Sequence, residues 1–180
     1  MLSLRGESVR VLVISADGYE DSELTEPVGA LREAGAEVDI AAPDAGAITG
    51  KHGARVEAGL AVAEADPAEY DMLFLPGGKA PARLRDSVEV QALVHAFMAD
   101  AKPIAAICHG PQILASAGVV KGHTMTAYES VGPELEEAGA DYVDQMVVSD
   151  ANFITARHPG DLPAFIEQVL ETLRQRADAH

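Results

Sequence analysis

The only cysteine of this 180-residue chain ends an apolar run, in the stretch AAICHGPQIL (residues 105–114). The run PIAAIC (103–108) predicts a buried strand, and Pro111 suits the first turn of a helix, where a missing backbone N–H costs nothing. A sharp turn from a strand into a helix can hold a nucleophile exposed above a sheet, and the helix N-terminus favours a thiolate. The sequence therefore predicts that Cys108 is a nucleophile held as an exposed thiolate of low pKa.

A glycine pair in the stretch LPGG (75–78) follows a second buried run and forms the next part of the predicted site. Active sites in open parallel sheets gather at the carboxyl ends of the strands, so we expect Gly77 and Gly78 near Cys108. Their free backbone N–H groups would stabilise an oxyanion there. A lone cysteine is often only a small buried apolar residue. Its place at a strand end, beside His109 and a second glycine loop, favours the nucleophile.

The elements that must position these groups alternate between strands and helices along the chain. We expect Asp161 to cap the last helix, and the Gly-rich segment 43–56 to form a turn or small hairpin. The pattern predicts one α/β domain over residues 1–180 (core about 9–173), a sandwich with a mostly parallel central sheet and helices on both faces. Strands are expected at 9–15, 37–42, 72–76, 103–108, 124–128, 144–149 and 152–157, and helices at 21–34, 88–100, from 110 onward, 133–140 and 161–176.

Composition narrows the classes of partner and cofactor. With 13 basic and 29 acidic residues the formal net charge is −16, which disfavours nucleic acid and anionic membranes as partners. The N-terminal stretch MLSLRGESVR lacks the apolar centre of a signal peptide, so a cytoplasmic location is expected. One cysteine makes neither an intramolecular disulfide nor a cysteine zinc site, and the six histidines lack metal-binding spacing. No phosphate-binding glycine motif is present, so neither a metal nor an organic cofactor is expected.

Four motifs together resemble those of a known family: AAICHGPQIL, LPGGKAP, the N-terminal DGYEDSEL and TGKHG. The chain resembles the PfpI-type intracellular protease family, within the superfamily of the Parkinson's-disease protein deglycase. The resemblance extends from about residue 9 to residue 173, with the motifs in the family order. It implies a flavodoxin-like, class I glutamine-amidotransferase-like fold with a nucleophile elbow. It also implies assembly with further copies of the chain, as a homodimer or hexamer.

The resemblance implies roles for particular residues. Glu23 would be a protonated or proton-sharing carboxyl beside the sulfur, since burial and a like charge raise a carboxyl pKa. From the sequence alone it could equally be an exposed acid in a first helical turn, where negative charge is favoured. Tyr128 would line the pocket, or else be a core aromatic at a strand end. The full set comprises the nucleophile Cys108, its base partner His109, the carboxyl of Glu23, the oxyanion-hole amides of Gly77 and Gly78, and Tyr128 in the pocket.

One position departs from the family pattern. In the family's peptidases a neighbouring subunit supplies an acid just after the proline that follows LPGG, and this chain has Ala82 there. Without that acid, His109 lacks the group that would fix its tautomer and stabilise its charged form. Asp86, one helical turn further on, could substitute. The departure weakens the argument for a peptidase and does not affect the pair of Cys108 and Glu23.

The sequence therefore leaves three functions open. The first is a stress-protective enzyme of the glyoxalase or deglycase kind, in which Cys108 attacks a reactive carbonyl or glycated group and Glu23 moves protons. The second is an intracellular cysteine peptidase that uses His109. The third is a non-enzymatic, redox-responsive stress protein or chaperone, whose Cys108 oxidises to a sulfenic or sulfinic acid.

Overall fold

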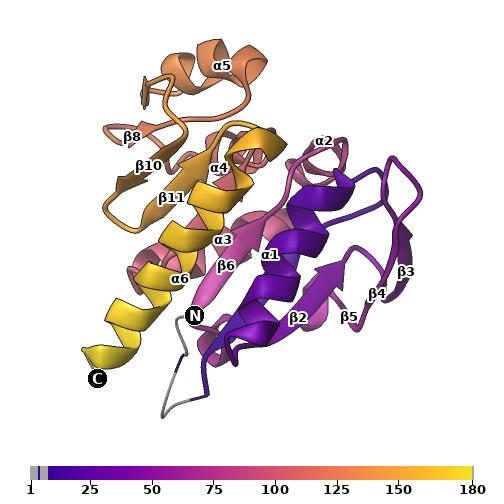
Figure 1. Ribbon diagram of the computed structural model, residues 1–180. Coiled ribbons are helices and arrows are strands. Elements are labelled where there is room, and N and C mark those ends of the chain that lie inside the picture. The colour runs from indigo at the N-terminus through magenta and orange to yellow at the C-terminus, as the bar shows by residue number, and fades with distance from the viewer. Residues whose placement is uncertain (1–3, 5–7, 180) are drawn as a thin grey trace.

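A seven-stranded sheet forms the centre of the molecule in a computed structural model that describes residue 4 and residues 8–179 (Figure 1). Residues 1–3, 5–7 and 180 lie outside the described residues. They include most of the N-terminal stretch MLSLRGESVR, on which the expectation about a signal peptide rests. The strand order is β10-β11-β7-β6-β1-β2-β5. Every neighbouring pair is parallel except β10 and β11. The strands are β1 (Arg10–Ile14), β2 (Glu37–Ala42), β5 (Leu60–Ala61), β6 (Met72–Leu75), β7 (Ile104–Ile107), β10 (Val147–Asp150) and β11 (Phe153–Ala156).

Helices cover both faces of the sheet. Figure 1 shows α1 and α6 side by side in front of it, with α3 and α4 behind. Short 3-10 turns occupy residues Val62–Glu64, Pro67–Glu69, Glu129–Val131 and Pro159–Asp161. Among the described residues, no helix has the length and apolarity needed to cross a bilayer. The helices are α1 (Asp21–Glu33), α2 (Ala80–Leu84), α3 (Val88–Ala99), α4 (Pro111–Ser116), α5 (Gly132–Glu137) and α6 (Leu162–Asp178).

Two smaller sheets flank the main one. The expected hairpin in the segment 43–56 is present as β3 (Gly46–Thr49) and β4 (Arg55–Ala58), which pair antiparallel. The strands β8 (Thr124–Met125) and β9 (Asp141–Tyr142) pair parallel in a sheet of their own.

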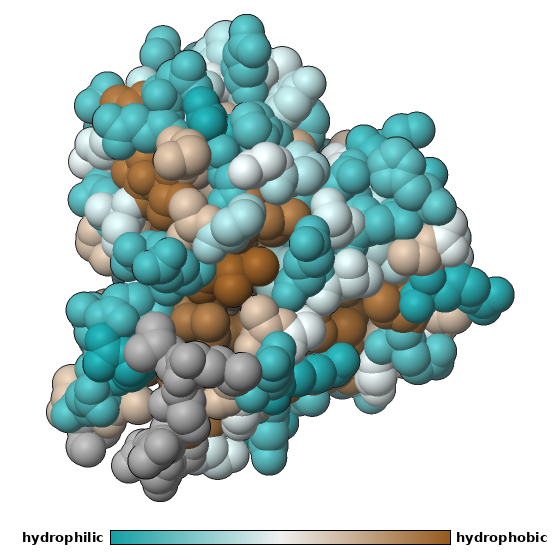
Figure 2. Space-filling view, in the orientation of Figure 1, coloured by the Kyte–Doolittle hydropathy of each residue, from teal (hydrophilic) through white to brown (hydrophobic). Residues whose placement is uncertain are grey.

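The core lies where both faces of the sheet are covered. All four residues of β6 and of β7 are buried, which explains why these strands are continuous apolar runs rather than alternating ones. The rings of Phe74 in β6 and Phe165 in α6 lie 5.8 Å apart, joining the sheet to its front helix. Figure 2 shows the corresponding surface: hydrophilic side chains dominate, and hydrophobic ones gather in a band across the centre of this face.

The α/β architecture predicted from the sequence is confirmed, and the differences are local. Asp161 does not cap α6 with its side chain; its carboxylate instead accepts hydrogen bonds from the backbone and guanidinium of Arg157. The strand expected at 124–128 is only two residues long and lies outside the main sheet. The helix α2 and the edge strand β5 were not expected from the sequence. Both are very short, so neither shows a hydrophobic period that a sequence pattern could reveal.

Candidate active site

Three adjacent strands bring the candidate residues together at one edge of the sheet. In the order β7-β6-β1, the carboxyl end of β7 leads into Cys108, that of β6 into Gly77 and Gly78, and that of β1 into the loop before Glu23. Backbone hydrogen bonds fasten the last two ends to each other, from the Glu20 N–H to the Gly77 carbonyl (3.2 Å) and from the Lys79 N–H to the Gly18 carbonyl (2.8 Å). Because adjacent parallel strands end at the same edge of the sheet, three separate sequence motifs meet at one site.

The turn at Cys108 has a left-handed backbone, with φ of 63°. This conformation is uncommon for a residue with a side chain and stores strain, which the surroundings must hold in place. The Cys108 N–H donates to the Ala156 carbonyl (3.0 Å), and its carbonyl accepts from the Tyr128 N–H (2.9 Å). A Cβ at Gly110 would lie 2.4 Å from the Leu75 carbonyl oxygen, so only glycine lets the turn pack this closely on β6.

The left-handed turn brings the side chains of neighbouring residues into contact. The Cys108 Sγ lies 3.2 Å from Nδ1 of His109, although adjacent side chains ordinarily diverge. The His109 ring stacks on Tyr128 with centroids 4.9 Å apart and planes inclined by 27°. Burial lowers the pKa of His109, and the positive charge of Lys51 lowers it further, so the imidazole is neutral at pH 7.

Glu23 is fully buried, although it lies in the first turn of α1. Its Oε1 accepts a hydrogen bond of 3.0 Å from the Gly77 N–H. A Cβ at Gly77 would lie 2.5 Å from that oxygen and 2.7 Å from the Cys108 Cβ, so Gly77 fills the narrow space between them. Burial, and secondarily the charge of Glu20, raises the pKa of Glu23 to about 8. The exposed-acid interpretation of Glu23 is therefore wrong.

The expectation that the Cys108 thiol is exposed is also wrong. Cys108 is buried, with 7% of its surface exposed. Burial raises the pKa of the Cys108 thiol to about 12, and the negative charge of Glu23 acts in the same direction, while the amides of Gly78 and His109 oppose it. Because two acids in contact titrate as a pair, Cys108 and Glu23 together carry no more than one negative charge near pH 8.

The two glycine amides are not equivalent. The Gly77 N–H is not free, because it donates to Glu23, which corrects the expectation of two free amides. The backbone amides of Gly78 and His109 act on the sulfur, since both lower the pKa of Cys108. Gly78 has a φ of 85°, and a Cβ there would lie 2.3 Å from the Glu20 nitrogen, so glycine is required at this position too.

A cavity of about 460 Å³ opens over the sulfur. Cys108, His109, Glu23, Gly78 and Tyr128 all line it, whereas Gly77 is not among the lining residues. Tyr128 is 41% exposed, so it is a cavity residue and not part of the core. Ala82 lines the cavity as well, and Asp86 is not among the lining residues. Within the described part of the chain, no cluster of histidine, cysteine and acidic residues has the arrangement of a metal site.

Three further charged residues line this cavity and were not expected from the sequence: Glu20, Lys51 and Lys79. The Lys51 Nζ lies 2.8 Å from a Glu20 carboxylate oxygen, and His52 Nε2 lies 3.2 Å from the other oxygen. The loop that carries Lys51 is fixed to the start of α1, because the Asp21 carboxylate accepts hydrogen bonds from the N–H groups of His52 and Ala54. The motif TGKHG is the only sign of Lys51 in the sequence, and nothing in it indicates which of its residues lines the cavity.

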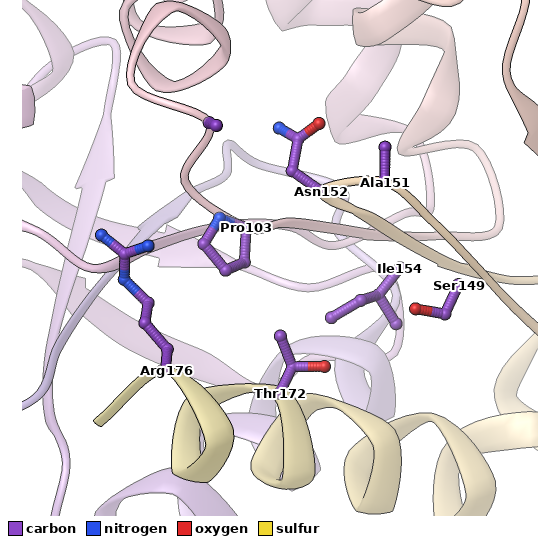
Figure 3. Close-up of a pocket in the computed structure, with 8 residues that line it drawn as sticks. Pro103, Ser149, Ala151, Asn152, Ile154, Thr172 and Arg176 are labelled. Atoms are coloured by element: carbon purple, nitrogen blue, oxygen red, sulfur yellow. The ribbon is translucent and has the colours of Figure 1, made fainter. Parts of the chain in front are cut away.

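A second cavity, of about 340 Å³, lies at the opposite end of the sheet (Figure 3). Pro103 and Asn152, which directly precede β7 and β11, line it together with Thr172 and Arg176 of α6. In Figure 3, Thr172 and Arg176 extend from α6 toward Pro103 and Ile154. The lining contains no thiol and no carboxyl, unlike that of the cavity over Cys108.

Comparisons with known proteins identify relatives of this chain. A deglycase of Thermococcus kodakarensis, TK1284, is 46% identical over 166 residues, which cover 92% of this chain and all of that protein. Protein/nucleic acid deglycase 2 of Escherichia coli is 41% identical over 169 residues, covering 92% of this chain and 98% of that one. The crystal structure of DJ-1beta from Drosophila melanogaster superimposes with a TM-score of 0.88 at 31% identity, covering 95% of this chain and 96% of that one. The model of the DJ-1/PfpI family matches residues 9–172, and the chain belongs to this family.

Proposed function

We propose that this protein is a cysteine-dependent, stress-protective enzyme that acts on reactive carbonyls or glycated groups through Cys108 and Glu23. The observation that carries the proposal is the buried carboxyl of Glu23, whose pKa near 8 keeps a proton available beside the thiol at neutral pH. The deglycase names of the relatives support the same class of substrate.

The proposed reaction begins when the Cys108 sulfur adds to an aldehyde carbon. A C–S bond forms, the C=O double bond becomes a single bond, and the proton shared by Cys108 and Glu23 goes to the oxygen. The amides of Gly78 and His109 are placed to stabilise the oxyanion that precedes this protonation. With a 2-oxoaldehyde, Glu23 then moves the C–H proton of the attacked carbon to the neighbouring carbonyl carbon. The hydroxyl proton passes to the oxygen of that neighbouring carbon, which gives the thioester of a 2-hydroxy acid. Water hydrolyses the resulting thioester, which releases a hydroxy acid and restores the thiol.

A peptidase is the second candidate, favoured by the contact of 3.2 Å between the Cys108 Sγ and the His109 Nδ1. It would require His109 to accept and hold a proton, yet burial lowers the pKa of this imidazole. Ala82 also lines the cavity where the family's peptidases place an acid. We therefore rank this function below the carbonyl enzyme.

The test measures methylglyoxal consumption by reduced protein, with Cys108→Ala and Glu23→Gln beside the wild type and a peptide-cleavage assay in parallel. We expect each substitution to reduce turnover by at least about 100-fold, the scale of a lost nucleophile or general acid–base. Glu26→Gln, which removes an exposed acid from the same helix, is the matched control and should retain activity.

Two results would count against the proposal. Peptide cleavage without methylglyoxal consumption would favour the peptidase. Inactivity in both assays, with Cys108 oxidised by mild peroxide to a sulfenic or sulfinic acid, would favour the redox-responsive protein.

A further inference from the structure

The cavity over Cys108 has a charge opposite to that of the whole molecule. The chain has a formal net charge of −16, but two lysines, Lys51 and Lys79, line this cavity. Two acids, Glu20 and Glu23, also line it, but burial raises the pKa of Glu23 to about 8, so Glu23 holds its proton at pH 7. His109 is neutral there, since burial lowers its pKa. The lining therefore carries a net positive charge, and an anion near the sulfur would be attracted rather than repelled.

Lys51 is the cation that the fold holds at this cavity. Its backbone N–H donates to the Tyr19 carbonyl (2.9 Å), and its ammonium lies 2.8 Å from Glu20. An ammonium has three N–H donors, so the contact with Glu20 leaves two of them for a ligand. The charge of Lys51 also acts on both Cys108 and His109.

We propose that Lys51 forms an anion subsite which selects, for attack by Cys108, small electrophiles that carry a carboxylate, in particular 2-oxoaldehydes that carry one. The identification of such compounds as substrates rests on the function proposed above, whereas the anion subsite itself does not. A cavity of about 460 Å³ is large enough for a compound of this size. In the bound state the carboxylate would accept hydrogen bonds from Lys51 while the carbonyl carbon faces the sulfur.

Two alkylating reagents of nearly equal size test the subsite without requiring turnover. Iodoacetate carries a carboxylate and iodoacetamide is neutral, and both modify the single cysteine of the chain, which mass spectrometry quantifies. Because both reagents attack the same thiolate, the ratio of their rate constants is independent of the fraction of thiolate present. We expect Lys51→Gln to lower the ratio of iodoacetate to iodoacetamide about fivefold, and added salt to lower it in the wild type.

Two further variants serve as controls. Lys51→Arg keeps the charge and should keep the ratio, which excludes a merely structural effect of the substitution. Lys121→Gln removes an exposed lysine that does not line the cavity, and should leave the ratio unchanged. An equal ratio in wild type and in correctly folded Lys51→Gln, as judged by circular dichroism and thermal unfolding, overturns the proposal.

Turnover of 4,5-dioxopentanoate, a 2-oxoaldehyde that carries a carboxylate, and of methylglyoxal separates this proposal from the general function. The subsite predicts that Lys51→Gln raises KM for 4,5-dioxopentanoate, which is anionic, more than for methylglyoxal, which is neutral. Equal effects on both substrates would overturn the subsite while leaving the carbonyl enzyme in place. If neither compound is consumed but the alkylation ratio falls in Lys51→Gln, the subsite is supported and the carbonyl function is not.

Discussion

At the scale of single residues, Glu23 links reactivity to stability. A carboxyl that is fully buried holds its proton in the folded protein up to about pH 8, whereas in the unfolded chain it releases the proton near its ordinary pKa of 4.5. Between these two values the folded state binds more protons than the unfolded state, so the free energy of unfolding falls as the pH rises. The group that supplies the proposed proton therefore destabilises the fold at neutral and alkaline pH.

We expect Glu23→Gln to gain stability relative to the wild type as the pH rises from about 5 to about 8. The pKa is raised by more than three units, each worth about 1.4 kcal/mol, so the relative gain should be on the order of 4 kcal/mol. Urea unfolding of both proteins at several pH values measures it, with Glu26→Gln as the control for loss of an exposed acid. A difference that stays constant across this range would show that Glu23 is not buried as a neutral acid.

The sequence predicted which residues form the site better than it predicted their pKa values. Motifs located Cys108, Glu23 and Gly78 because their chain positions follow strand ends or fit a family pattern. The pKa of Cys108 could not be predicted, because it depends on burial by segments far away in the chain and on the distance to Glu23. Lys51 was missed for the same reason, since only docking of the hairpin onto the start of α1 brings its ammonium to the cavity.

At the scale of elements, the turn between β7 and α4 depends on close backbone packing. Gly110→Ala would place a Cβ 2.4 Å from the Leu75 carbonyl oxygen, which is backbone and cannot move aside cheaply. We expect this substitution to lower the free energy of unfolding by at least about 2 kcal/mol, within the range measured for overpacking, and to reduce the reactivity of Cys108. Chemical denaturation and the iodoacetamide rate measure the two effects.

Gly29→Ala is the matched control for this substitution. Gly29 is exposed in the interior of α1, and a Cβ there would meet nothing within 4 Å. Alanine should therefore stabilise the protein by up to about 1 kcal/mol, because it favours the helix over the unfolded chain. If both alanine variants behaved alike, the tight packing at Gly110 would not be the cause of its effect.

Whether a segment forms a strand or a helix was easier to predict than where it ends and which strand it pairs with. The buried strands β1, β6 and β7 follow from apolar runs, because a parallel sheet covered on both faces needs apolar residues throughout. Pairing is a tertiary property, and so the sequence did not indicate that residues 124–125 leave the main sheet to pair with residues 141–142. Similarly, the carboxylate of Asp161 was available for a cap, but Arg157 competes for it.

At the scale of the whole molecule, the net charge of −16 sets how stability responds to salt. Like charges repel in the compact state more than in the unfolded chain, and salt screens this repulsion. Raising NaCl from about 10 mM to about 150 mM should raise Tm by roughly 2–4 °C, the shift expected for about 1 kcal/mol in a domain of this size. Scanning calorimetry measures the change. A Tm independent of salt would indicate that local ion pairs already compensate the acidic surface.

Pro27, in the interior of α1, affects how the first turn of this helix is held in place. Proline has no N–H, and the carbonyl four residues before it, which an ordinary helix would bond, belongs to Glu23. The first turn of α1 is thus joined to the rest of the helix by one hydrogen bond fewer than a regular helix provides. Contacts outside the helix hold this turn instead: the Asp21 carboxylate accepts hydrogen bonds from the hairpin loop, and the Glu23 carboxyl accepts one from Gly77.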